Sequence, residues 1–271
     1  MSTAAVEPLV IAIDSSTSAS KAVVVDIRGN VLSEGKADID LLSPEMNHYE
    51  HDPAQWWTST RDAIAAATAA LDPVDRARVA ALCITHQRES FVLVDDDGTA
   101  LRPAILWLDS RAGAEIKEFG SAHIHELSGK PADTTPALYK MAWLKRHEPD
   151  LIAAADKVVD VHAYLAKHLV GRWVSAMGSA DTLNLMDIAN QDYADELLDI
   201  AGVRRDQMAE LAAPASIIGE IDPEVLAQWD LPEGVVLVAN FRSSPRSEGF
   251  HSRWSGLGTR QARTSPMTTR H

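Results

Sequence analysis

The chain has 271 residues, of which 46% are hydrophobic, so it can bury a substantial core and belongs to the globular class of proteins. Its formal net charge of -14 argues against nucleic acid as the main partner, because phosphate backbones are bound through excess lysine and arginine. A single cysteine, no basic and apolar leader, and no apolar run long enough to cross a bilayer predict a cytoplasmic protein that does not enter membranes.

The first predicted elements are two strands joined by a short polar turn. Residues 9–13 and 22–25 are apolar and rich in β-branched side chains, and small hydroxylated residues lie between them, which predicts a hairpin. Such a turn leaves N–H groups and hydroxyls free to surround an anion, while Lys21 adds positive charge and Asp14 can hold a divalent metal. This chemistry suits a nucleotide phosphate tail with Mg²⁺. The alternative is a serine-rich hairpin that binds nothing.

A third strand and a long helix are expected next. Val31 to Glu34 would complete an antiparallel meander, and a helix would begin at Pro53, with Asp52 as its N-cap, and run to about Leu71. Five residues recur at helical spacing and should face the sheet, including a tryptophan pair that we interpret as core packing: Trp56, Trp57, Thr60, Ile64 and Ala67.

The most informative polar stretch follows a predicted buried strand, Val79 to Ile84. Ligands gather at strand ends in α/β sheets, because a rigid scaffold holds the loops there. Arg88 can donate hydrogen bonds and Glu89 can accept them, so the pair could hold the vicinal hydroxyls of a polyol. The alternative is a mutual ion pair at the surface, which contributes little.

The remaining pattern alternates strands and helices. Strands are predicted at 91–94, 103–107, 157–160 and 235–239, and helices at 136–147 and 161–170. His123 and His125 are two residues apart and would diverge on a helix, so we expect no zinc site.

Several of these stretches resemble one family. Asp14 to Lys21 has the form Asp-x-x-Thr-Ser-x-x-Lys, which resembles the phosphate loop of the FGGY family of sugar and polyol kinases, a group of actin-like ATPases. Glu50 to Trp57 and the Trp-x-Asp-x-Arg motif of 107–111 resemble xylulokinases, whereas Gln-Arg-Glu at 87–89 resembles glycerol kinases. Two positions depart from the pattern: Ser16 stands where the family usually has glycine, and Thr135 where glycerol kinases place a tyrosine.

The resemblance implies an α/β fold, a ribonuclease-H-like (actin-like ATPase) domain with a mixed sheet flanked by helices. The implied reaction is ATP-dependent phosphorylation of a hydroxyl of a small sugar or polyol, with xylulose-like substrates as our first choice and glycerol as the second. Asp14 would hold Mg²⁺, and three loop residues would bind the ATP phosphates: Thr17, Ser18 and Lys21.

The acceptor would be held by Arg88, Glu89, Trp107 and Asp109. By the resemblance, Trp107 stacks against the carbon face of the substrate, and Asp109 and Arg111 shape the pocket or the helix that follows it. Considered without the family, Asp109 would cap that helix and Arg111 would be solvated.

The resemblance covers roughly Leu9 to Ala239 and has no counterpart for the family's C-terminal domain, so we assign residues 1–239 to the N-terminal, sugar-binding domain of the family. Residues 240–271 carry six arginines and one acid, Glu248, and we expect an atypical, disordered tail, which we interpret as an out-of-frame continuation. The family's general-base aspartate is missing after Ala239, so no catalytic residue is identified and we expect this chain to lack measurable kinase activity.

Two other functions remain open. One is a non-catalytic half-kinase that binds sugar or a protein partner, and the other is an actin-like ATPase of the chaperone type, which would not need the Arg88, Glu89 and Trp107 group. Association into a homodimer also stays open.

Overall fold

The computed structural model describes residues 7–240, and the predicted tail lies outside the described residues except for Asn240. Its first three strands are β1 (Leu9–Ser15), β2 (Ala19–Asp26) and β3 (Val31–Asp38), which pair antiparallel in chain order. The predicted meander is therefore confirmed, and β3 continues to Asp38, beyond the predicted end at Glu34. Asp14 and Lys21 lie opposite each other where β1 and β2 meet the turn.

A six-stranded mixed sheet is built on this meander, in the order β13-β14-β5-β1-β2-β3. Strands β5 (Val79–His86) and β14 (Val236–Val238) run parallel to β1, and β13 (Ile217–Glu220) closes the far edge antiparallel to β14. Because β1, β5 and β14 are parallel, the loops that follow them lie at the same edge of the sheet. This edge receives the polar turn after Asp14 and the Arg88–Glu89 stretch.

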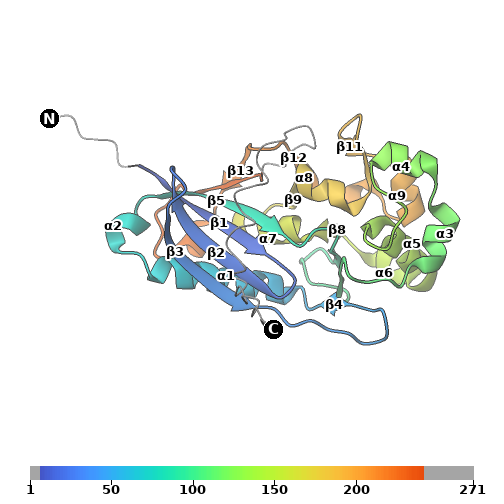
Figure 1. Cartoon of the computed structure of the whole chain (residues 1–271), viewed down its shortest axis with the longest axis horizontal. Coiled ribbons are helices and arrows are strands. Elements are labelled where there is room, and N and C mark those ends of the chain that lie inside the picture. Colours follow the sequence, from blue (N-terminus) through green and yellow to red (C-terminus); the bar gives the residue numbers. More distant parts are fainter. Residues whose placement is uncertain (1–6, 241–271) are drawn as a thin grey trace, which may run out of the picture. The chain divides into compact units, whose positions relative to one another are not determined.

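Helix α1 (Ala54–Ala69) packs against β2 and β3, as Figure 1 shows beneath the blue strands. Four of the five residues predicted to face the sheet are buried: Trp56, Thr60, Ile64 and Ala67. Trp57 is half-buried and stacks on His168 of α7 (Val161–Val170), with ring centroids 4.9 Å apart. The helix begins one residue later than predicted, after Pro53, but the Asp52 carboxylate still accepts a hydrogen bond from the N–H of Ala54 at 3.0 Å.

A second, four-stranded sheet has the order β4-β7-β6-β8 and is antiparallel throughout. Its strands are β4 (Glu50–His51), β7 (Ala104–Ile105), β6 (Phe91–Val94) and β8 (Lys157–Asp160). The prediction of a strand over 103–107 was wrong in its length, because the chain turns at Leu106, whose carbonyl accepts the N–H of Asp109 at 3.1 Å.

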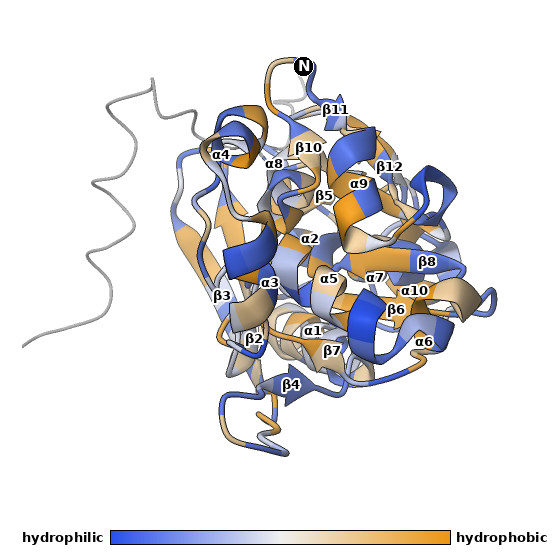
Figure 2. Cartoon of the chain, turned by 90° about the vertical axis from the view of Figure 1, so that its right-hand side faces the viewer, coloured by the Kyte–Doolittle hydropathy of each residue, from blue (hydrophilic) through white to orange (hydrophobic). Residues whose placement is uncertain are grey.

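Helices cover a second hydrophobic core beside this sheet. Leu138, Met141 and Leu144 of α5 (Ala137–His147) are buried in it, as predicted, together with residues of α4 (Ala122–Ser128) and α9 (Asp195–Ala201). Figure 2 looks onto these helices, and α9 shows hydrophilic residues along one side and hydrophobic residues along the other, as expected for a helix over a core.

The remaining elements are short. They are the helices α2 (Pro73–Arg76), α3 (Gly113–Phe119), α6 (Pro149–Ala154), α8 (Met177–Ala180) and α10 (Pro223–Ala227), the 3₁₀ turns at Asp181–Leu183 and Arg205–Gln207, and the strand pairs β9 (Val174–Ala176) with β12 (Glu210–Ala212) and β10 (Met186–Asp187) with β11 (Asp192–Tyr193). The predicted α/β domain, a mixed sheet flanked by helices, is confirmed. Within residues 7–240 no helix has the length and apolar character needed to cross a membrane.

Candidate active site

The turn between β1 and β2 is closed by Ser16. Its N–H and its hydroxyl both donate to the carbonyl of Ala19, at 3.0 Å and 2.8 Å. Ser16 is not among the residues with positive φ, so the turn does not use the backbone freedom of glycine at this position. Serine therefore closes the loop where the family usually has glycine.

Donors in this turn are free to meet an anion. Among the described residues, the backbone N–H groups of Thr17 and Ser18 have no hydrogen-bond partner. Successive free N–H groups in a turn make a concave site for phosphate oxygens, and the exposed ammonium of Lys21 is close enough to Asp14 to act on its pKa. The residues present thus fit a phosphate group at this turn.

Asp14 is exposed at the end of β1. Partial burial raises the pKa of its carboxyl above the usual value, while Lys21 and His86 act in the opposite direction. A bound divalent cation would favour the ionised form, and no arginine of residues 7–240 pairs with the Asp14 carboxylate. Asp14 therefore fits a Mg²⁺ ligand, directly or through waters.

Buried hydroxyl groups connect the β1–β2 hairpin to α1. The Ser20 hydroxyl lies within hydrogen-bond distance of three others: Ser15 at 3.3 Å, Ser59 at 2.8 Å and Thr60 at 3.1 Å. Ser59 and Thr60 belong to α1, so this cluster fixes the hairpin to the helix.

The loop after β5 carries the predicted acceptor residues. Glu89 has φ 62°, in the left-handed region that non-glycine residues seldom adopt, and its N–H donates to the Thr182 hydroxyl at 3.1 Å. Burial raises the pKa of the Glu89 carboxyl, and the nearby cations Arg88, Lys130 and Lys140 oppose this effect. Arg88 is exposed at the surface of the loop. Strained backbone at a polar loop is a feature of binding sites.

Trp107 connects the acceptor loop with the phosphate loop. Its indole N–H donates to the Thr17 hydroxyl at 2.9 Å, and its backbone N–H donates to the Ser90 hydroxyl at 3.2 Å. The residue is 38% exposed, so much of the indole is open to a ligand. Two groups of residues that the sequence predicted separately are thus brought into contact.

Asp109 lies beneath this loop. The residue is fully buried, and its two carboxylate oxygens accept hydrogen bonds from the N–H of Tyr49, from the N–H of Arg111 and from the Arg111 guanidinium, at 2.7 to 3.0 Å. Burial alone would raise the pKa of Asp109, but the bonds from Arg111 and Tyr49 outweigh it and lower that pKa. We expect Asp109 to be among the residues that hold the substrate; in the structure its oxygens accept hydrogen bonds from Tyr49 and Arg111, and contact with a substrate stays a prediction.

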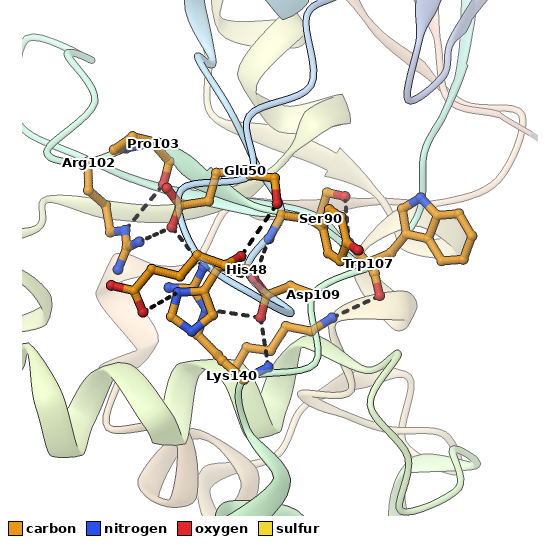
Figure 3. A network of polar contacts seen from close by, with 12 residues as sticks. His48, Glu50, Ser90, Arg102, Pro103, Trp107, Asp109 and Lys140 are labelled. Carbon is orange, nitrogen blue, oxygen red and sulfur yellow. Dashed lines mark hydrogen bonds and ion pairs between the residues drawn. The ribbon is translucent and has the colours of Figure 1, made fainter.

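The Arg111 guanidinium is buried, with only 2% of its side chain exposed. It pairs with Glu50 at 2.8 Å and with Asp109 at 2.7 Å, and it lies 5.0 Å from the Trp143 ring centroid. The interpretation of Arg111 as a solvated side chain was therefore wrong. Glu50 also binds Arg102, as Figure 3 shows, so the network ties β4 to the loop after β7.

Lys140 is a site residue that the sequence reasoning missed. Its side chain is fully buried on α5, and its ammonium donates to the carbonyl of Trp107 at 3.2 Å (Figure 3) and to the carbonyl of Thr135 at 2.8 Å. Burial lowers the pKa of Lys140 to about 8, against the opposing charges of Asp109 and Glu89. Helical spacing could have predicted the burial of Lys140, because this residue lies three positions after Ala137 and four before Leu144 and so shares their buried face.

At the end of β14 stands Asn240, whose amide lies 3.3 Å from the Ser179 hydroxyl. No carboxylate follows β14 within the part of the chain that the structure describes. At this point, where the resemblance leads us to expect the general base, the described chain has Asn240.

Comparison with known proteins identifies the family. Residues 9–241 match the family model for the N-terminal domain of the FGGY family of carbohydrate kinases. The chain is 32% identical over 233 residues to a xylulose kinase of Klebsiella pneumoniae, covering 84% of this chain and 47% of that protein. A glycerol kinase of Thermococcus onnurineus is 30% identical over 226 residues, which cover 80% of this chain and 45% of that protein.

Solved structures agree in fold. A xylulose kinase from Rhodospirillum rubrum superimposes with a TM-score of 0.80 at 26% identity, covering 86% of this chain and 48% of that one. The chain spans about half the length of the relatives it matches. Since the actin-like ATPase fold agrees with the match to the family's N-terminal domain, the chain belongs to the FGGY family of carbohydrate kinases.

Proposed function

We propose that this chain supplies the acceptor pocket and the phosphate loop for ATP-dependent phosphorylation of a small sugar or polyol hydroxyl. The observation that carries the proposal is the arrangement of the Asp14 loop and the Arg88–Glu89 loop at one edge of the sheet, joined through Trp107 and Thr17. Phosphoryl transfer depends on positioning and charge neutralisation more than on covalent chemistry, and an edge that holds both reactants provides the positioning.

On the phosphate side, Asp14 would hold Mg²⁺, which neutralises charge on the transferring phosphoryl group when bound. The free N–H groups of Thr17 and Ser18 would donate to the ATP phosphates, and Lys21 would add a positive charge. These groups need no rearrangement of the turn, because Ser16 already closes it.

On the acceptor side, Arg88 would donate to the substrate hydroxyls and Glu89 would accept from them, while Trp107 would cover the carbon face of the substrate. Asp109 acts on the pocket indirectly in this proposal, because it holds Arg111 and the backbone of Tyr49 and lies two residues after Trp107 in the chain. Xylulose-like substrates remain our first choice and glycerol the second, since the relatives of 32% and 30% identity are kinases of these two compounds.

A second candidate is sugar binding without phosphoryl transfer. It is favoured by Asn240 at the end of β14, where an amide hydrogen-bonded to Ser179 stands at the position for which a base was expected. An amide cannot accept the proton of a hydroxyl, so the chain would hold the acceptor without activating it.

The test is a titration of the labelled chain with D-xylulose, xylitol and glycerol at millimolar concentrations, observed through backbone amide resonances. Resonances of residues 85–90 and 107 are expected to shift. Replacing Glu89→Ala should weaken binding by about 1 to 3 kcal/mol, the cost of leaving polar groups of the pocket unpaired. Glu34→Ala, at an exposed glutamate of β3, is the matched control and should bind as the native chain does. Resonances 85–90 that stay in place with all three compounds would refute the acceptor pocket.

A further inference from the structure

The hydrogen bond between Trp107 and Thr17 joins two side chains that the proposed function assigns to different ligands. The two residues are 90 positions apart in the chain, and the donor and acceptor atoms are 2.9 Å apart. The direction of the bond is fixed, because an indole N–H can only donate, so the Thr17 hydroxyl is the acceptor.

This direction leaves the Thr17 hydroxyl proton available. A threonine hydroxyl has one proton to donate and two lone pairs to accept with, and Trp107 occupies one lone pair. The proton of Thr17 can therefore point to a phosphate oxygen at the turn. Because hydrogen bonds in a chain polarise one another, the bond from Trp107 makes this hydroxyl a stronger donor toward an anion.

Trp107 is held so that the bond can form. Its backbone N–H is bound to Ser90, next to Glu89, and its carbonyl to the buried ammonium of Lys140 (Figure 3). The backbone on both sides of the indole is thus fixed to the acceptor loop and to α5. The indole is the hydrogen-bond donor to Thr17, so a sugar that restricts the motion of the indole also restricts this hydrogen bond.

We propose that the Trp107–Thr17 hydrogen bond couples the two halves of the site, so that a sugar on Trp107 and a phosphate at the β1–β2 turn each strengthen the binding of the other. The inference rests on the proposed function and adds to it an energetic link between the acceptor and the phosphate donor. Thermodynamic linkage requires the coupling factor to be the same in both directions. One hydrogen bond that strengthens on binding corresponds to a factor of about 2 to 10.

The probes are D-xylulose for the acceptor side and Mg²⁺-pyrophosphate for the phosphate side, added to the full 271-residue chain. Calorimetry gives the dissociation constant of each probe with and without the other, and the ratio is the coupling factor. The native chain should show about a 2- to 10-fold ratio in both directions. Trp107→Phe keeps a ring for the sugar but has no N–H, so its ratio should fall to 1; any general loss of affinity cancels, because the ratio is taken within one variant.

Trp173→Phe makes the same change away from this site, beside Lys167 and Gly98, and should keep the native ratio. A native ratio of 1 with both probes bound, or an unchanged ratio in Trp107→Phe, would overturn the coupling. The indole N–H resonance of Trp107, assigned by its loss in Trp107→Phe, gives a readout that needs no sugar. Mg²⁺-pyrophosphate alone should shift it together with the amides of residues 16–21.

Failure of the proposed function is distinguishable from failure of the coupling. If D-xylulose does not bind, the acceptor assignment fails, while a shift of the Trp107 indole with Mg²⁺-pyrophosphate still supports the link to the phosphate loop. If the amides of 16–21 shift and the indole does not, the phosphate assignment holds and the coupling is refuted.

Discussion

Removing the Arg111 guanidinium should destabilise the protein strongly. In Arg111→Met the aliphatic stem is kept, but Asp109, which is fully buried, loses its two hydrogen bonds from the guanidinium and keeps two backbone N–H donors. Glu50 keeps Arg102. Breaking a buried ion pair from one side costs about 3 to 5 kcal/mol, because the remaining charge is left without its partner. The near-zero exposure of both groups means that solvent screening does not reduce this figure.

The measurement is urea unfolding at pH 7 of the native chain, Arg111→Met and a control, Arg61→Met. Arg61 pairs with Asp62 at 2.8 Å, but the side chains are 40% and 55% exposed, so its loss should cost less than about 1 kcal/mol. The double variant Asp109→Asn with Arg111→Met should recover part of the loss, since it removes the unpaired charge. Equal unfolding free energies for Arg111→Met and Arg61→Met would refute the reasoning that the Asp109–Arg111 pair is a buried, mutually required unit.

Three further predictions follow from other parts of the structure. Gly35→Ala should destabilise the packing of β3 on α1 by about 1 to 3 kcal/mol, because the added carbon would lie 2.1 Å from the Ala63 carbonyl oxygen, whereas Gly113→Ala meets nothing within 4 Å and should be close to neutral in urea unfolding. Burial lowers the pKa of His51 to about 4, so between pH 6.5 and 4 the unfolded chain binds a proton that the folded chain does not, and stability should fall as the pH falls through this window. His51→Asn, which keeps an acceptor for the Trp56 indole, should show a shallower decline between pH 7 and pH 5, and an equal slope would contradict the assignment. Finally, we expect from the sequence that the 271-residue chain releases no measurable ADP with pentuloses or polyols, because the residue after Ala239 is an amide, Asn240, which cannot take the proton of a hydroxyl; robust sugar-dependent turnover would disprove this.

Local pattern was sufficient for the main strands and helices and for the chemistry of individual loops. Short apolar runs rich in β-branched residues indicated the meander of β1, β2 and β3, and spacing along α1 and α5 indicated which side chains are buried. These features depend on neighbours within a few residues, which the sequence displays directly. The same holds for the small, polar turn after Asp14, where residue types alone indicate donors for an anion.

Only the tertiary structure decided which charged residues are buried and which partners they have. Considered without the family, Arg111 is expected to be solvated, because arginine side chains are mostly exposed. In the structure it is buried and pairs with Glu50, 61 positions earlier in the chain. Lys140 and Trp107 meet across 33 positions, and Trp107 and Thr17 across 90. Whether a charge is buried depends on partners that are distant in sequence, because desolvation is offset only where the fold brings an opposite charge or a carbonyl within hydrogen-bond distance.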